Sequence, residues 1–226
     1  MARSFPHWPK HIIYRIIKRI LRSLNFSWRR IRRKPKGEPD PKEYARKKAE
    51  LEKLKEQAER GEIDLYYVDE SGFCLVPYVP YAWQEKGETI EIESGGKKRL
   101  NILGFLSLEH GLVAYTTEEN IDSDVVIAFF DTFISGLIRK TVFVMDNSPY
   151  HTSGAIEAKK AEWRSKNLEI FYLPKSSPQL NLIEILWRFM KYEWVHWWAY
   201  KGWSYLVKYI EMIICGYGTE YEINFG

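Results

Sequence analysis

Two apolar runs that each end in an aspartate constrain the fold of this chain more than any other feature. Residues 65–68 are uncharged and lead into Asp69, and residues 141–145 are uncharged and lead into Asp146. Short, continuously apolar runs are typical of strands buried in a sheet. Acids that follow such strands can converge on one edge of the sheet, so we expect both aspartates at adjoining strand ends.

Glu184 supplies a third carboxylate, in an apolar stretch predicted to form a helix. An acid at the start of such a helix can lie at the same sheet edge as the two aspartates. Clustered carboxylate oxygens are hard ligands that suit Mg²⁺ or Mn²⁺. We expect two ions, because a metal pair stabilises both the attacking and the leaving oxygen when a phosphodiester is cleaved.

Each of these residues could also have a purely structural role. An aspartate after an apolar run can simply cap a strand, and Glu184 could favour the positive end of a helix dipole. His151, in the loop after Asp146, could equally serve only to pack that loop. Trp83 and Trp187 are interpreted as core residues rather than rings that stack on a substrate.

The remaining pattern indicates a mixed α/β sheet flanked by helices, because strands come first and then alternate with helices. A turn at residues 109–111 would join two of the strands in a hairpin. Strands are predicted at residues 65–69, around 81–85, and at 99–107, 111–116, 141–145 and 168–173. Helices are predicted at residues 10–26, 41–60, 122–138, 154–166, 182–198 and 203–215.

Composition excludes several classes of protein. The 226 residues suit one domain with an appendage, and the hydrophobic fraction of 45% can supply a core. Cys74 and Cys215 lie far apart without zinc or disulfide spacing, so we expect buried free thiols in a reducing cytoplasm. No run approaches the length of a transmembrane helix, and the N-terminus lacks the core of a secretory signal, so no membrane association is expected.

Charge is distributed unevenly along the chain. Residues 1–36 hold 12 of the 34 Lys and Arg residues and no acid, which leaves 34 − 12 = 22 basic against 30 acidic residues elsewhere. This basic helical arm predicts a polyanionic partner, although it could also be a helix that packs on the body or lies on a membrane surface. The residues expected to contact a polyanion such as DNA are Arg15, Lys18, Arg19, Arg22, Arg29, Arg30, Arg32, Arg33 and Lys34.

Several motifs together resemble the DDE transposases of the IS630/Tc1/mariner superfamily. They are Val-Asp-Glu-Ser-Gly-Phe at 68–73, Trp83 with Gly87, Met-Asp-Asn at 145–147 with His151, and the stretch 173–187 with Lys191. The resemblance covers residues 65–195 firmly and 10–60 more loosely. It implies a ribonuclease H-like fold in which Asp69, Asp146 and Glu184 form the metal-binding catalytic triad.

The resemblance also implies supporting residues around the triad. Asn147 and His151 would orient a phosphate or the ligands, and Asn181 lies in the motif that leads to Glu184. Glu70 would point to the opposite face of the sheet from Asp69 if the strand continues through it. Asn147, His151, Asn181 and Glu70 are therefore expected to support the site rather than to carry the reaction.

Two positions depart from the family pattern. Leu182 stands where proline is usual, and proline would pre-set the first turn of the helix that carries Glu184. Leucine there is expected to loosen that turn without removing a ligand. Ser176 stands where an aromatic residue is common.

The resemblance divides the chain into a basic helical arm at residues 1–36, a linker and charged helix at 37–62, and the catalytic domain at 63–226. The arm resembles the end of a helix-turn-helix module, so the chain is expected to be shortened at its N-terminus. The implied function is transposition of a prokaryotic insertion sequence, with DNA cleavage at the element ends and strand transfer into target DNA.

The implied partners are terminal inverted repeats, target DNA and a second transposase chain or a homodimer, in the cytoplasm at the nucleoid. Two alternatives remain compatible with the sequence. One is a ribonuclease H-like nuclease without strand transfer, and the other is an inactive DNA-binding relic of a transposase.

Overall fold

The computed structural model describes residues 10–27, 39–92, 97–148 and 151–225. The chain divides into two compact units, Met1–Lys36 and Gly37–Gly226. In the first unit, the amphipathic helix α1 spans Lys10–Ser23. It ends before the predicted residue 26 because Asn25 adopts a left-handed φ of 63°, a conformation that terminates helices. Of the predicted DNA contacts, Arg29, Arg30, Arg32, Arg33 and Lys34 lie outside the described residues.

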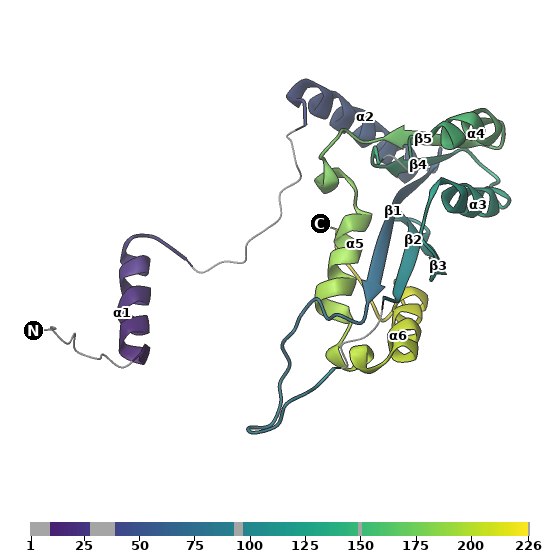
Figure 1. Cartoon of the computed structure of the whole chain (residues 1–226). Coiled ribbons are helices and arrows are strands. Elements are labelled where there is room, and N and C mark those ends of the chain that lie inside the picture. The colour runs from purple at the N-terminus through teal and green to yellow at the C-terminus, as the bar shows by residue number, and fades with distance from the viewer. Residues whose placement is uncertain (1–9, 28–38, 93–96, 149–150, 226) are drawn as a thin grey trace, which may run out of the picture. The chain divides into compact units, whose positions relative to one another are not determined.

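The second unit is built on one five-stranded sheet with the order β3-β2-β1-β4-β5 (Figure 1). Strands β1 and β2 are antiparallel, as are β2 and β3, whereas β4 is parallel to both β1 and β5. This arrangement confirms the predicted mixed sheet and the predicted hairpin. The strands are β1 (Asp64–Cys74), β2 (Arg99–Ser107), β3 (Gly111–Thr117), β4 (Thr141–Met145) and β5 (Leu168–Tyr172).

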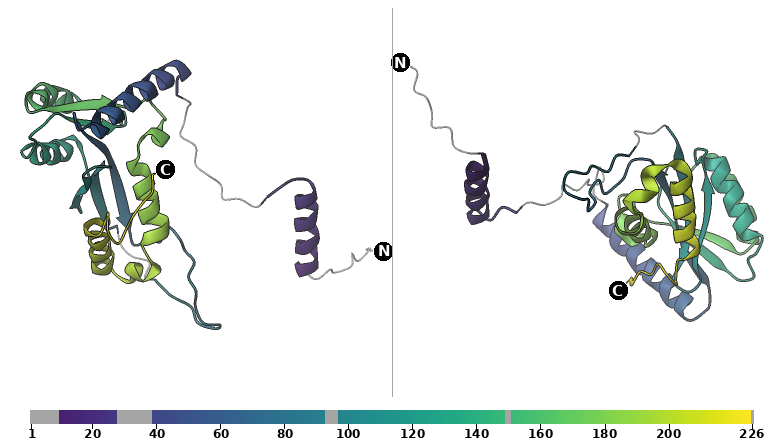
Figure 2. Two further views of the ribbon diagram at one scale, coloured as in Figure 1. Left: turned by 180° about the vertical axis from the view of Figure 1, so that it is seen from behind. Right: turned by 90° about the horizontal axis from the view of Figure 1, so that it is seen from below.

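Helices cover both faces of the sheet (Figure 2). Three of them begin at a side chain that accepts a hydrogen bond from the first turn, namely Asp40, Asp122 and Ser153. The helix predicted at 182–198 is interrupted, because the α-helical hydrogen bonds give way to a π-helical turn and then a 3₁₀ segment. The helical elements are α2 (Pro41–Glu59), α3 (Ser123–Ile134), α4 (Gly154–Ser165), η1 (Pro178–Leu180), α5 (Ile183–Phe189), η2 (Met190–Trp194), η3 (Trp197–Lys201) and α6 (Trp203–Cys215).

Alternation along β1 creates a separate core on each face of the sheet. Leu65, Tyr67 and Phe73 join a buried cluster with residues of α5 and α6. Tyr66 and Val68 join a second cluster with residues of α3 and α4. Because side chains alternate between the faces of a strand, an odd-numbered residue of β1 lies on the α5 side and an even-numbered one on the α3 side.

The segment between β1 and β2 differs from the prediction. No strand forms near residues 81–85, and the described parts of this segment run as a long loop away from the sheet (Figure 1). Pro77 and Pro80 remove backbone donors that a strand would need. Trp83 is 100% exposed, so its interpretation as a core residue was wrong.

The cysteines also differ in part from expectation. Both are free, as predicted, but Cys74 is only half-buried and Cys215 is exposed. Cys215 is the last residue of α6 and does not belong to the buried face of that helix. The prediction of buried thiols was therefore wrong.

Helix α5 rests directly on the backbone of β2 at Gly104. A Cβ atom at this position would lie 2.7 Å from the Trp187 ring and 2.9 Å from the Ile183 side chain. Trp187 is buried, as predicted for a core residue. Gly104 is also the cross-strand partner of Asp69. The absence of a side chain at Gly104 therefore sets how closely the helix that carries Glu184 approaches the strand that carries Asp69.

We predict that Gly104→Ala lowers the free energy of unfolding by about 1–3 kcal/mol, because the added methyl overpacks the contact with Trp187. Urea unfolding followed by tryptophan fluorescence measures the change. Gly154→Ala is the matched control, because a Cβ at Gly154 meets no atom within 4 Å. Equal stability of the two variants would show that α5 can shift away from β2 without cost.

Candidate active site

Asp69 and Asp146 lie on adjacent strands at the point where their pairing ends. The parallel register pairs Tyr67 with Val144, which places Asp69 and Asp146 two residues further along each chain at the same level. Asp146 follows the last residue of β4, as predicted. Asp69 is not at a strand end, because β1 continues to Cys74 and pairs with β2 over that length. The two aspartates are still neighbours, because Asp146 lies where β4 ends and Asp69 lies at the same level on the adjacent strand β1.

Glu184 reaches the same edge from the first turn of α5. Asp69 is odd-numbered and therefore lies on the face that α5 covers, and Glu184 is the second residue of this helix. Burial raises the pKa of Asp69 well above its ordinary value, and the negative charges of Glu184, Glu70 and Asp146 raise it further. Burial also raises the pKa of Glu184, with a contribution from Asp146. The three predicted acids are thus close enough to repel one another.

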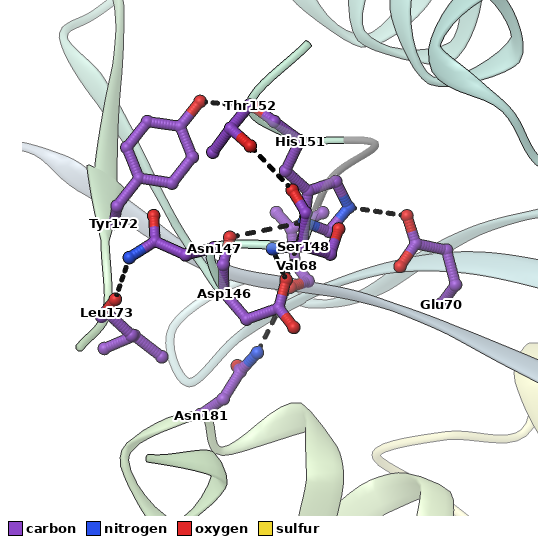
Figure 3. Close-up of polar contacts among 10 residues, drawn as sticks. All are labelled: Val68, Glu70, Asp146, Asn147, Ser148, His151, Thr152, Tyr172, Leu173 and Asn181. Carbon is purple, nitrogen blue, oxygen red and sulfur yellow. Dashed lines mark hydrogen bonds and ion pairs between the residues drawn. The ribbon is translucent and has the colours of Figure 1, made fainter. Parts of the chain in front are cut away.

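His151 joins two of the acids (Figure 3). The ring is fully buried, with Nδ1 2.8 Å from Asp146 Oδ1 and Nε2 2.6 Å from Glu70 Oε1. Burial opposes protonation, but the hydrogen bonds and charges of Asp146 and Glu70 raise the pKa of His151 to about 10. Its ring therefore carries a proton on each nitrogen and donates to both carboxylates.

The hydrogen bond between His151 and Asp146 also determines the charge on Asp146. Burial alone would raise the pKa of Asp146, but the hydrogen bond from His151, its positive charge and the backbone N–H of Ser148 bring it below the ordinary value. Asp146 is consequently held ionised, and one of its oxygens is fixed in direction. Glu70 points away from the Asp69 face, as predicted, and acts on Asp146 through His151.

Two asparagines tie the surrounding segments together. The Asn147 amide donates to the Leu173 carbonyl oxygen at 2.8 Å and so links the chain after β4 to the chain after β5. Asn181 is buried and donates to the Val68 carbonyl oxygen at 3.2 Å, next to Asp69 (Figure 3). This bond fixes the start of α5 against β1. The other amide atom, Asn181 Oδ1, has no hydrogen-bond partner in the described part of the chain.

The turn that carries Glu184 is closed with leucine at position 182. Leu182 has φ −61°, which is close to the value that proline would impose. The Ile185 N–H donates to the Leu182 carbonyl oxygen at 3.0 Å and closes the first turn. The loosening of this turn relative to proline stays a prediction. Ser176, the second departure from the family pattern, adopts a left-handed φ of 58°.

Two residues at this site were not assigned a role from the sequence. Tyr172 donates its hydroxyl to the His151 carbonyl oxygen at 2.6 Å and anchors the loop that carries the imidazole (Figure 3). Lys191 lies near the acids, because the charges of Asp69 and Glu184 act on its pKa. In the sequence, the position of Lys191 two helical turns after Glu184 could have indicated that it lies near the acids. No sequence feature pointed to a role for Tyr172.

Chemically, the site offers carboxylate oxygen ligands that lie close together and carry negative charge. Burial and mutual repulsion raise the pKa values of Asp69 and Glu184, and a divalent cation would relieve the repulsion. The donor set therefore fits Mg²⁺ or Mn²⁺. Within the residues that the structure describes, no group of three or more His, Cys, Asp and Glu side chains is yet arranged to hold a metal ion.

The sheet order, the helices on both faces and the acids at the β1–β4 edge together define a ribonuclease H-like nucleic-acid-processing domain. A family model described as DDE superfamily endonuclease matches residues 64–201. The chain belongs to this family. The predicted membership of the DDE class is thus confirmed, and the match includes all three predicted acids.

Solved structures support the same fold. The Mos1 mariner paired end complex with Mn aligns with a TM-score of 0.57 at 14% identity, covering 96% of this chain and 74% of that chain. The Mos1 strand transfer complex gives a TM-score of 0.55 at 16% identity, covering 89% and 62%. The catalytic domain of Mos1 mariner transposase gives 0.50 at 14% identity, covering 79% and 84%. No curated protein matches the chain.

These similarities confirm the predicted ribonuclease H-like fold. The chain spans less than two thirds of the length of the transposase in the strand transfer complex. Among the described residues, no helix is long and apolar enough to cross a membrane.

We predict that His151 makes the stability of the metal-free protein depend on pH. The pKa of His151 is about 10 in the folded chain and 6.5 in its ordinary state. Its stabilising effect is therefore complete below pH 6.5 and is lost as the pH rises towards 10. The loss approaches about 1.4 kcal/mol per pH unit in that window.

Urea unfolding in EDTA across this pH range tests the prediction. The decline should be smaller in His151→Gln, which retains a polar side chain but does not titrate. If both proteins lose stability in parallel, His151 is not held protonated between Glu70 and Asp146.

Proposed function

We propose that this protein is the catalytic part of a DDE transposase that cleaves DNA and joins the cut end to a target. The observation that carries the proposal is the meeting of Asp69, Asp146 and Glu184 at one sheet edge, where burial and mutual repulsion raise the pKa values of Asp69 and Glu184. Membership of the DDE superfamily endonuclease family supports the same reaction class.

Asp69, Asp146 and Glu184 would hold the divalent ions, because carboxylate oxygens are the ligands that Mg²⁺ and Mn²⁺ prefer. Bound ions supply charge that stabilises the attacking and leaving oxygens at phosphorus, and two ions suit this chemistry. The similar Mos1 mariner paired end complexes were solved with Mn and with Mg, which supports this choice of metal.

The protein's own residues prepare this site. Glu70 and His151 orient Asp146 and keep it ionised, because the imidazolium donates to both carboxylates. Asn181 holds the start of α5 at the Val68 carbonyl oxygen, which keeps Glu184 beside Asp69. Asn147 ties the loop after β4 to the Leu173 carbonyl oxygen and limits its movement when a phosphate enters.

The reaction is an in-line displacement at phosphorus without a covalent protein intermediate. Water attacks the scissile phosphodiester at an element end, and the P–O bond to the departing 3′ oxygen breaks. That oxygen takes a proton to become a 3′-hydroxyl. The hydroxyl then attacks a phosphodiester of target DNA, which forms one P–O bond as another breaks.

The proposed partners are the terminal inverted repeats, target DNA and a second transposase chain. Mos1 structures described as a paired end complex and a strand transfer complex support this assignment. The proposed location is the nucleoid in the cytoplasm of a prokaryote, as part of an insertion sequence.

Helix α1 is proposed to add a contact with DNA that does not depend on base sequence. Arg15, Lys18, Arg19 and Arg22 are all exposed, and the first turn of the helix holds no acid. Lys18 Nζ lies 5.4 Å from the centre of the Tyr14 ring. An exposed basic face of this kind binds phosphates rather than base edges.

Two different functions would leave the fold unchanged. A ribonuclease H-like nuclease would cut DNA but never join strands, and an inactive relic would bind DNA without cutting it. The arrangement of the triad does not separate the transposase, the nuclease and the relic, because each of these proteins would hold the three acids at the same place. A substrate that reports both cleavage and joining separates them.

We predict that Asp69→Asn, Asp146→Asn and Glu184→Gln each reduce cleavage and joining of a labelled, pre-nicked element-end duplex in Mn²⁺ by at least about 100-fold, because each removes charge at the reacting phosphate. DNA binding should persist in all three. Glu169→Gln, an exposed acid at the far end of β5, is the control and should react normally.

Strong metal-dependent cleavage by any triad variant would remove that residue from the site. Cleavage by the parent protein without joining would favour the nuclease. Neither reaction in a folded, DNA-binding protein would favour the relic.

We predict that replacing Arg15, Lys18, Arg19 and Arg22 with glutamine weakens DNA binding to a similar extent for element ends and random duplex, because phosphate contacts carry no sequence information. Fluorescence anisotropy at several salt concentrations measures both affinities. A loss confined to element ends would mean that α1 reads bases.

A further inference from the structure

The hydroxyl group of Tyr67 is a buried polar group that the proposed function does not use. Tyr67 lies on β1 two residues before Asp69 and therefore on the same face of the sheet. Its side chain is 1% exposed, and its hydroxyl has no hydrogen-bond partner within the described residues. A buried hydroxyl without a partner costs free energy, so folded proteins nearly always supply one.

The Tyr67 side chain borders a small cavity between α2, β1 and the turn that joins β2 to β3. The cavity has a volume of about 40 Å³. One water molecule needs at least about 10–15 Å³ of such space, whereas sites for organic ligands usually exceed about 300 Å³. The cavity therefore has room for water but not for an organic ligand. The residues that line it are Lys55 and Glu59 of α2, Leu65 and Tyr67 of β1, and Leu108 and Glu109 of the turn.

The polar side chains that line the cavity keep hydrogen-bonding capacity. Lys55 Nζ donates to Glu52 Oε1 at 3.0 Å, which uses one of the three protons on the ammonium group. Ser107 Oγ donates to Glu109 Oε2 at 2.9 Å, and the carboxylate can accept several more hydrogen bonds. With the Tyr67 hydroxyl, these groups supply the two to four polar partners that a buried water usually has.

The charges around the cavity favour a neutral ligand. Lys55 contributes a positive charge, and Glu59 and Glu109 contribute negative ones, so a bound cation would be repelled by the lysine and a bound anion by the glutamates. Burial raises the pKa of Tyr67, and the charges of Glu52 and Glu109 raise it further. The phenol therefore keeps its proton at neutral pH and can donate a hydrogen bond.

We propose that this cavity binds an ordered water molecule, which accepts a hydrogen bond from the Tyr67 hydroxyl and donates to Glu59 and Glu109. The water joins α2, β1 and the turn between β2 and β3, which are far apart in the sequence. Because Tyr67 precedes Asp69 by two residues, the same bridge holds α2 against the strand that carries the first acid of the triad. The inference does not depend on any reaction with DNA.

The first test is a crystal structure of the full chain at a resolution that shows ordered water. We expect density for a water oxygen at about 2.7–2.8 Å from Tyr67 Oη, the usual distance between hydroxyl oxygens. A Lys55 or Glu59 side chain that reaches Tyr67 Oη directly would overturn the proposal. A cavity without density for water would overturn it as well.

The second test asks whether the Tyr67 hydroxyl is hydrogen-bonded in solution. Tyr67→Phe removes the hydroxyl and keeps the ring, so the variant should fold. If water holds the hydroxyl, urea unfolding should show an equilibrium constant for unfolding that is raised by about fivefold, the effect of one ordinary hydrogen bond. If the hydroxyl has no partner, its removal relieves the cost of burial and the constant falls instead.

Tyr66→Phe is the matched control. Tyr66 is the neighbouring residue of β1, but its side chain joins the core cluster on the opposite face and does not line the cavity. This variant should stay close to the parent protein. Support for the water site requires both the density beside Tyr67 and the loss of stability in Tyr67→Phe, and an unchanged or more stable Tyr67→Phe variant would overturn the proposal.

Discussion

The close contact between α5 and the backbone of β2 is the constraint on which the rest of the site depends. Trp187 and Ile183 can approach β2 only because residue 104 is glycine. Gly104 pairs with Asp69, so the same contact brings Glu184 to the face of the sheet on which Asp69 lies. A Cβ at this position would overlap the Trp187 ring, so a larger residue would push α5, and Glu184 with it, away from the strand that pairs with Asp69.

Bringing acids together raises their free energy, and the surrounding residues respond in two ways. His151 is buried between Asp146 and Glu70 and balances their charge. On the α5 side, burial raises the pKa values of Asp69 and Glu184, although the charge of Lys191 opposes the rise at Glu184. The site is therefore asymmetric, with one aspartate held ionised and two acids poised to gain from a divalent cation.

Much of the fold could be predicted from hydrophobic period and turn residues. Strands β2 and β4 and helix α6 have the predicted bounds, because their apolar runs are long or sharply bounded by charge, glycine or proline. Periodicity was less informative where tertiary contacts decide the outcome. β1 extends past Asp69 because β2 pairs with it, and the region around Trp83 is a loop because prolines interrupt its hydrogen bonding.

The sequence by itself determined which residues can carry the chemistry, since the acids, their flanking apolar runs and the motif around Glu184 are local features. Only the tertiary structure decided how they act together. The bridge from Glu70 through His151 to Asp146 joins residues on separate elements. Such contacts depend on strand register and helix packing, which no local pattern specifies because they arise from the folded chain as a whole.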